Sequence, residues 1–102
     1  MKLKLEFQYF EGCPNHTKMQ NNIAEAIKGL EDQIELKQVL VEDDATARKV
    51  AFRGSPTLLI DGEDIEEVAV PDEPNMACRF YVNGIPSANK IREIIIEKIN
   101  KE

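Results

Sequence analysis

The hydrophobic pattern of the chain changes its period at a single cysteine. Residues 3–9 alternate between apolar and polar side chains, which is the period-2 pattern of a β-strand. After residue 14 the apolar residues recur every three or four positions until about residue 30, which predicts one face of a helix. Cys13 therefore lies at the turn between a strand and a helix.

This placement makes Cys13 a candidate reactive thiol. The first N–H groups of a helix have no partner within it and carry partial positive charge, so a sulfur there is stabilised as thiolate, its reactive form. Gly12 allows a sharp turn before the cysteine, and Pro14 suits the first helical position because it lacks an N–H. The alternative for a cysteine in such a chain is a small, buried apolar residue.

The middle of the chain alternates between predicted strands and helices. Residues 34–41 favour a second strand buried on both faces, followed by a short helix over residues 45–51 with an acidic start. Residues 57–60 predict a third apolar strand. The dipeptide Asp61-Gly62 is a strong hairpin signal, so we expect residues 65–70 to return antiparallel to that strand. This order implies right-handed crossovers and a sheet covered on both faces.

The last third of the chain starts with a polar, proline-punctuated loop over residues 71–75. Residues 76–82 fit either one more strand or an ordered loop. Ser87 is a good N-cap for a final helix that extends to Ile99. The chain has no repeat, low-complexity tract or linker, so residues 1–102 are expected to form a single domain.

Two stretches of the chain resemble the thioredoxin-like superfamily. Phe10-Glu11-Gly12-Cys13-Pro14 is similar to the strand end and first active-site cysteine of thioredoxins and glutaredoxins. The stretch 47–62, which contains Ser55-Pro56-Thr57, is similar to the helix, cis-proline turn and strand that face this cysteine. The resemblance implies an α/β fold, a three-layer α/β/α arrangement with a mixed sheet of about four strands and flanking helices.

The resemblance also implies a substrate site, with one departure from the family pattern. In the family the cis-proline turn packs beside the cysteine, and the residue before the proline, here Ser55, offers its backbone to an extended thiol substrate. The substrate-binding residues implied in this way are Pro14, Ser55, Pro56 and Thr57. Dithiol members carry two cysteines separated by two residues, whereas this chain has His16 at the second place, in a Cys-Pro-Asn-His motif.

One route for Cys13 is a dithiol cycle in which Cys13 attacks a substrate and Cys78 resolves the mixed disulfide. A disulfide needs its two Cα atoms within about 7 Å of each other. A hairpin that returns residues 71–78 to the end of the first strand would meet this condition. If Cys78 instead begins a strand that pairs with residues 57–60, it lies at the far end, and the sequence leaves both arrangements open.

A second route resembles that of single-cysteine glutaredoxins, in which glutathione or another thiol resolves Cys13. His16, one helical turn from the sulfur, would then pair with the thiolate or carry the proton; otherwise it is a solvent-facing residue in the first turn of a helix. Arg53 and Arg79 are candidates for holding glutathione by their position only, with solvation at the surface as the default.

Two further alternatives are not catalytic. Cys13, His16 and Cys78 offer two thiolates and an imidazole, a soft set suited to Zn, Cu(I) or a mercurial, although their spacing is not diagnostic. A thioredoxin-like domain without the second local cysteine could also serve only to dock another protein. We favour thiol–disulfide exchange, with Cys13, Cys78 and His16 as catalytic residues and with no cofactor or resident metal, and the sequence leaves open whether the protein is an enzyme.

The charge balance narrows the classes of partner. The 102 residues contain 13 Lys and Arg against 19 Asp and Glu, a net charge of −6, so neither nucleic acid nor an anionic membrane is expected. The expected partner is a thiol or disulfide, on a protein or in glutathione. Apolar runs fall short of the ~18 residues of a membrane span, the N-terminus lacks a signal-peptide pattern, and two cysteines are too few for a secreted disulfide framework. A cytoplasmic location is therefore expected, and nothing in the sequence indicates an oligomeric state.

Overall fold

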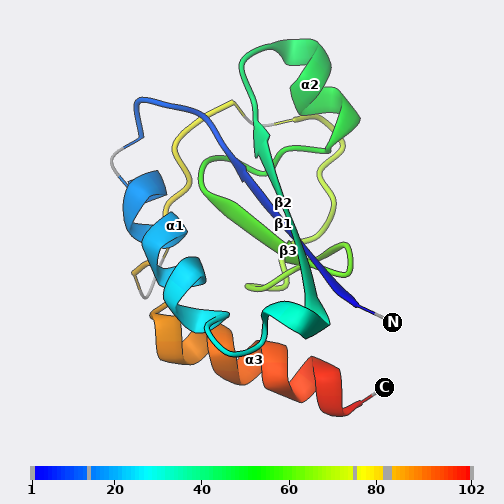
Figure 1. Cartoon of the computed structure of the whole chain (residues 1–102). Coiled ribbons are helices and arrows are strands. Elements are labelled where there is room, and N and C mark those ends of the chain that lie inside the picture. Colours follow the sequence, from blue (N-terminus) through cyan, green and yellow to red (C-terminus); the bar gives the residue numbers. More distant parts are fainter. Residues whose placement is uncertain (1, 14, 75, 82–83, 102) are drawn as a thin grey trace.

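The described residues form a four-stranded sheet and three α-helices (Figure 1). The computed structural model describes residues 2–13, 15–74, 76–81 and 84–101. The elements, in chain order, are β1 (Leu3–Tyr9), α1 (Asn15–Ala26), a 3₁₀ turn (Glu31–Gln33), β2 (Ile34–Leu40), α2 (Asp44–Lys49), β3 (Thr57–Ile60), β4 (Glu63–Asp64) and α3 (Ala88–Asn100).

The sheet is mixed, with the strand order β2-β1-β3-β4. β1 pairs parallel to β2 and antiparallel to β3, and β3 pairs antiparallel to β4. The predicted α/β fold with a mixed sheet of about four strands is therefore confirmed. Because β1 is central, its carboxyl end, which leads to Cys13, lies beside the start of β3.

One face of the sheet carries the main core. Leu5 is paired with Leu36 on β2 and with Ile60 on β3, and these three apolar side chains point toward α1 and α3, which lie against this face (Figure 1). The same alternation that predicted β1 places Leu3, Leu5 and Phe7 here. The buried members of this core are Leu3, Leu5, Phe7, Met19, Ile23, Ala26, Ile34, Leu58, Ile60, Tyr81, Ile91 and Ile95.

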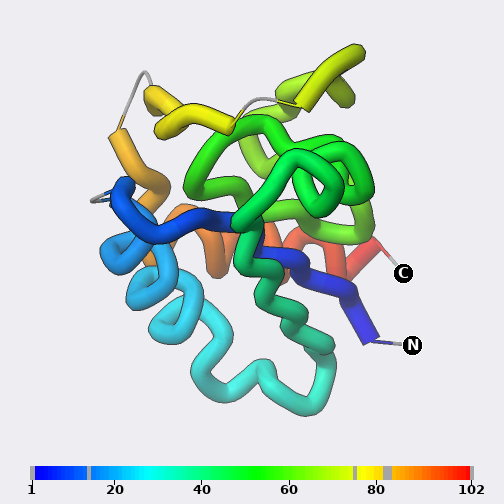
Figure 2. The backbone as a smooth tube through the Cα atoms, turned by 90° about the horizontal axis from the view of Figure 1, so that it is seen from above, coloured from blue at the N-terminus to red at the C-terminus, as the bar shows by residue number. Residues whose placement is uncertain are grey.

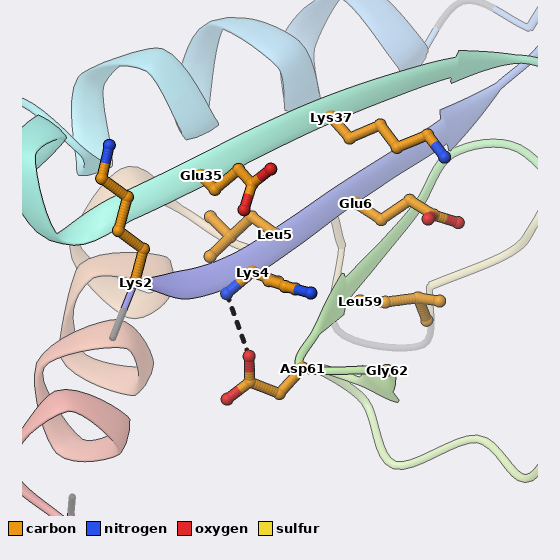
Figure 3. A pocket seen from close by; sticks show the side chains of 9 residues that line it. All are labelled: Lys2, Lys4, Leu5, Glu6, Glu35, Lys37, Leu59, Asp61 and Gly62. Atoms are coloured by element: carbon orange, nitrogen blue, oxygen red, sulfur yellow. Dashed lines mark hydrogen bonds between the residues drawn. The ribbon is translucent and has the colours of Figure 1, made fainter.

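The opposite face is covered by α2 only at the carboxyl end of β1. There Ala47 packs with Val41 and Phe52 in a second, smaller buried cluster. Farther toward the start of β1, residues of opposite charge are register neighbours on β1 and β2, Lys4 opposite Glu35 and Glu6 opposite Lys37. They line an open depression (Figure 3).

This open face corrects one expectation. Residues 34–41 were expected to be buried on both sides, but β2 is an edge strand, and Glu35 and Lys37 are exposed. In an edge strand with one solvated face, apolar and polar side chains alternate as they do in antiparallel strands, because only half of its side chains are covered.

The hairpin signal at Asp61-Gly62 is confirmed, but the strand that follows is much shorter than expected. Both turn residues have positive φ, 51° and 86°, as a two-residue hairpin turn requires. The return strand is only Glu63–Asp64, so the expected strand over residues 65–70 is wrong. The reason is Asp64: its carboxylate accepts the N–H of Glu66 at 2.7 Å and its carbonyl accepts the N–H of Glu67 at 2.8 Å, which turns the chain out of the sheet.

Residues 76–81 run beside the turn that precedes β3, and Figure 2 shows this yellow segment passing over the green one. Cys78 forms an isolated parallel bridge with Ser55, so the segment is an ordered loop with one bridge rather than a full strand. Val82, the last residue of the predicted segment, lies outside the described residues. No described helix combines the length and the apolar character that crossing a bilayer would take.

Two neighbouring isoleucines of α3 test this packing. Ile95 is fully buried, whereas Ile96 is 38% exposed. Ile95→Ala should lower the free energy of unfolding by about 2–5 kcal/mol, because it removes buried methylene groups and leaves a cavity. Ile96→Ala, measured by the same denaturant titration, should change it by less than about 1 kcal/mol. Equal losses in the two variants would contradict this orientation of α3.

Candidate functional site

Cys13 and Cys78 form a disulfide in the structure. Their Cα atoms are 5.6 Å apart, although the residues are separated by 65 positions in the sequence. Cys13 follows β1 and lies two residues before the start of α1. Of the two arrangements that the sequence left open for Cys78, the structure has the one that places it beside Cys13.

The two cysteines differ strongly in their exposure to solvent. Cys13 is 1% exposed and counts among the buried core residues, whereas Cys78 is an exposed residue. Of the two bonded residues, Cys78 is therefore the one that solvent reaches.

The backbone of Ser55 is fully engaged by the segment that carries Cys78. The N–H of Ser55 donates to the carbonyl of Ala77 at 2.9 Å, and the carbonyl of Ser55 accepts the N–H of Arg79 at 2.7 Å. The Ser55–Pro56 peptide bond is cis. The backbone edge that the family resemblance assigns to an extended substrate is thus occupied by the chain itself.

The side chains of Ser55 and Thr57 are both buried and hold the turn together. Ser55 Oγ accepts the N–H of Phe10 at 3.1 Å, which ties the turn to the end of β1, and Thr57 Oγ1 donates to the carbonyl of Gly54 at 2.6 Å. Pro56 is also buried. Pro14, the remaining residue of the predicted substrate site, lies outside the described residues.

A buried ion cluster anchors the loop directly after Cys78. The guanidinium of Arg79 binds the carboxylate of Asp64 in a bidentate manner, with N–O distances of 2.6 and 2.9 Å, and donates to Thr57 Oγ1 at 3.1 Å. Arg53 Nε lies 3.8 Å from the same carboxylate. The side chains of Arg79, Arg53 and Asp64 are 8%, 5% and 0% exposed, respectively.

This cluster corrects the expectation that Arg53 and Arg79 are solvated at the surface or available to hold glutathione. Neither is a solvated surface residue, and neither presents its charge outward to a glutathione carboxylate, because both are turned inward to Asp64. Burial acts to lower the pKa of Arg79, but its hydrogen bonds to Asp64, with nearby negative charge, hold that pKa above the ordinary value. Arg79 is therefore charged at every physiological pH.

Tyr81 adds a second anchor to the same loop. Its hydroxyl donates to the carbonyl of Pro56 at 2.6 Å, and the guanidinium of Arg79 lies 4.6 Å from the centre of its ring. Burial raises the pKa of the Tyr81 hydroxyl well above its ordinary value. The phenol therefore keeps its proton and remains a donor to Pro56.

Gly54 allows the close approach of this loop. Its φ is +109°, and a Cβ at this position would lie 3.1 Å from both the Ala77 carbonyl oxygen and Arg79 Cβ. Only glycine combines that backbone conformation with such proximity.

His16 lies near the disulfide but faces the backbone. Its Nδ1 is 2.9 Å from the carbonyl oxygen of Cys13, its Nε2 is 3.4 Å from Thr17 Oγ1, and its ring stacks on Tyr9 at 5.2 Å between centroids. Its proton-transfer role stays a prediction. Within the described parts of the chain, no group of three or more His, Cys, Asp or Glu side chains is arranged to hold a metal ion.

Sequence reasoning missed the anchors of the loop: Asp64, Arg79 as an internal residue, and Tyr81. Asp64 and Arg79 look like ordinary surface charges, and their partnership depends on the path of residues 65–78. Gly54 was the one available signal, because glycine is the residue that tolerates a close approach by another part of the molecule.

Comparison with known proteins supports one conclusion about the fold. No family model and no curated protein matches the chain. Among solved structures, one described as a malarial protein superposes with a TM-score of 0.62 at 16% identity, covering 96% of this chain and 97% of that one. The structure of thioredoxin-2, described as a component of the malaria parasite protein secretion machinery, also gives 0.62, at 17% identity, covering 94% and 82%. The fold is thioredoxin-like. At such low identity the likeness concerns the fold alone.

The Asp64 cluster makes a prediction with a matched control. Asp64→Asn removes the charge that two buried guanidinium groups face, and it should lower the free energy of unfolding by about 3–5 kcal/mol. The neighbouring Glu63 is largely exposed and lies 3.7 Å from Lys98, so Glu63→Gln should cost no more than about 1 kcal/mol. Equal effects in urea denaturation would mean that the cluster does not stabilise the fold.

The raised pKa of Tyr81 predicts a loss of stability in alkali. The folded state favours the protonated phenol. The contribution of Tyr81 to the free energy of unfolding is therefore complete below the ordinary tyrosine pKa of about 10. It is lost as the pH rises from there through the pKa of Tyr81 in the folded state. The free energy of unfolding of the wild type should therefore fall more steeply above pH ~10 than that of Tyr81→Phe. Tyr9→Phe, the other tyrosine variant, should keep the steep fall.

Proposed function

We propose that the chain is a thiol–disulfide exchange protein whose redox couple is Cys13 and Cys78. The observation that carries this proposal is the disulfide between a cysteine at the β1–α1 turn and a cysteine bridged to the Ser55–Pro56 turn. The second cysteine, Cys78, lies on a loop that is distant in the sequence. It provides the second thiol that the Cys-Pro-Asn-His motif lacks.

The chemistry is a two-electron exchange with an external thiol or disulfide. In the reducing direction, the Cys13–Cys78 dithiol forms its internal disulfide while an external disulfide is cleaved to two thiols, which take up both electrons and both protons. Cys13 is suited to the thiolate state because the N-terminus of α1 follows it. The bond that forms and the bond that breaks are both disulfides, so no cofactor is needed.

The surface around Cys78 favours a protein partner over glutathione. Phe80, two residues after Cys78, is 84% exposed, and Met76, two residues before it, is 40% exposed. Exposed aromatic and methionine side chains beside a reactive group are typical of protein contact surfaces. The cations that would hold glutathione, Arg53 and Arg79, are instead bound to Asp64.

Intact mass under defined redox conditions tests the proposed couple. Wild-type protein equilibrated with oxidised glutathione should lose the mass of two hydrogen atoms, and peptide mapping should link Cys13 to Cys78. Dithiothreitol should restore the mass, because the couple is reversible.

The controls for this measurement are single substitutions at and beside the site. Cys78→Ser should instead give a glutathione adduct or a free thiol at Cys13, whereas His16→Ala should keep the internal link. Two unlinked thiols in the oxidised wild type would rule out the Cys13–Cys78 couple.

A further inference from the structure

We propose that Cys78 is the sulfur that exchanges with external partners and that Cys13 is the internal sulfur, the reverse of the order expected from the motif at Cys13. This assignment rests on the proposed Cys13–Cys78 couple. It concerns which of the two sulfurs forms the mixed disulfide with a partner.

Solvent access distinguishes the two cysteines. A thiolate must approach the sulfur that it attacks in line with the bond that breaks, so a buried sulfur is not a site of attack. Cys13 is 1% exposed, and Cys78 is exposed. In the oxidised protein, Cys78 is therefore the cysteine through which solvent reaches the bond.

The loop that carries Cys78 is also held in position by contacts other than the disulfide. It is held to the Ser55 turn by two backbone hydrogen bonds, one through Ala77 and one through Arg79. The Arg79 guanidinium adds its bidentate contact to Asp64, and the Tyr81 hydroxyl its bond to the Pro56 carbonyl. None of these contacts involves a sulfur atom, so reduction of the disulfide removes none of them directly.

The reduced protein should consequently keep the same arrangement. Gly54 packs against the backbone on both sides of Cys78, which leaves the loop no need to move when the sulfurs separate. Cys13 stays buried beside the loop that carries Cys78, while Cys78 stays exposed. The Ser55 backbone also stays occupied, so a partner cannot bind there as an added extended segment.

The chemistry of the leaving group favours the same direction. In thiol–disulfide exchange, the sulfur with the lower pKa leaves faster. Cys13 precedes the twelve-residue helix α1, whose N-terminus stabilises negative charge, whereas Cys78 lies in a loop. Attack at Cys78 therefore releases Cys13 as a thiolate next to the N-terminus of a helix.

The steps balance in both directions. An external thiolate attacks Cys78 Sγ, the Cys13–Cys78 bond breaks, and Cys13 leaves as thiolate; a second external thiol then releases Cys78 by forming an external disulfide. In reverse, the Cys78 thiolate attacks an external disulfide and expels one thiolate. Cys13 then attacks Cys78 Sγ, restores the internal disulfide and expels the second thiolate.

Pulse alkylation of reduced wild-type protein tests the assignment. A brief pulse of substoichiometric iodoacetamide, quenched with acid and followed by peptide mapping, should label Cys78 at least about tenfold more than Cys13. The same pulse in concentrated urea should label the two cysteines equally, which shows that the preference comes from the fold. Equal labelling of the folded protein, or preferential labelling of Cys13, would overturn the proposal.

Two single-cysteine variants extend the test to disulfide exchange. Cys13→Ser should react with glutathione disulfide at least about tenfold faster than Cys78→Ser, in which the loop still covers Cys13. Adding Arg79→Gln to Cys78→Ser loosens the loop and should raise the rate at Cys13. A faster reaction of Cys78→Ser than of Cys13→Ser would overturn the proposal, while failure of the wild type to form the internal disulfide would instead overturn the proposed couple.

Discussion

The contact on which the site depends is the buried ion pair between Asp64 and Arg79. An arginine and a carboxylate that are almost wholly removed from water need each other, because an unpaired charge at either position would be strongly destabilising. The pair joins the end of the β3–β4 hairpin to the residue directly after Cys78. It therefore fixes a loop of little regular structure against the sheet and sets the distance between the two cysteines.

Much of the fold follows from local patterns in the sequence. The alternation over residues 3–9 specifies β1, and Asp61-Gly62 specifies the hairpin turn, because only a few residues adopt positive φ readily. The errors concern how far a pattern extends. Residues 65–70 are apolar enough for a strand, yet Asp64 binds the next backbone N–H groups and ends the ladder, which is a competition that hydrophobicity alone does not reveal.

The site was only half predictable, for a related reason. Cys13 is placed by its neighbours, since the strand before it and the helix after it are both local. Cys78 is placed by a side chain that reaches a carboxylate 15 positions away in the sequence, and no local preference encodes that contact. The sequence could thus indicate which cysteines are present and what chemistry they suit, but the depth at which each one lies depends on long-range packing.

The disulfide also links the oxidation state of the protein to its folding. It closes a covalent loop that contains α1, β2, α2 and the β3–β4 hairpin, whereas α3 lies outside it. For a separation of 65 residues, the chain-entropy model gives about 4 kcal/mol of destabilisation of the unfolded state. Oxidation and folding then favour each other. Any change that loosens the core therefore also makes the disulfide easier to reduce. The reason is that an unfolded chain holds its two cysteines far less tightly together than the folded one.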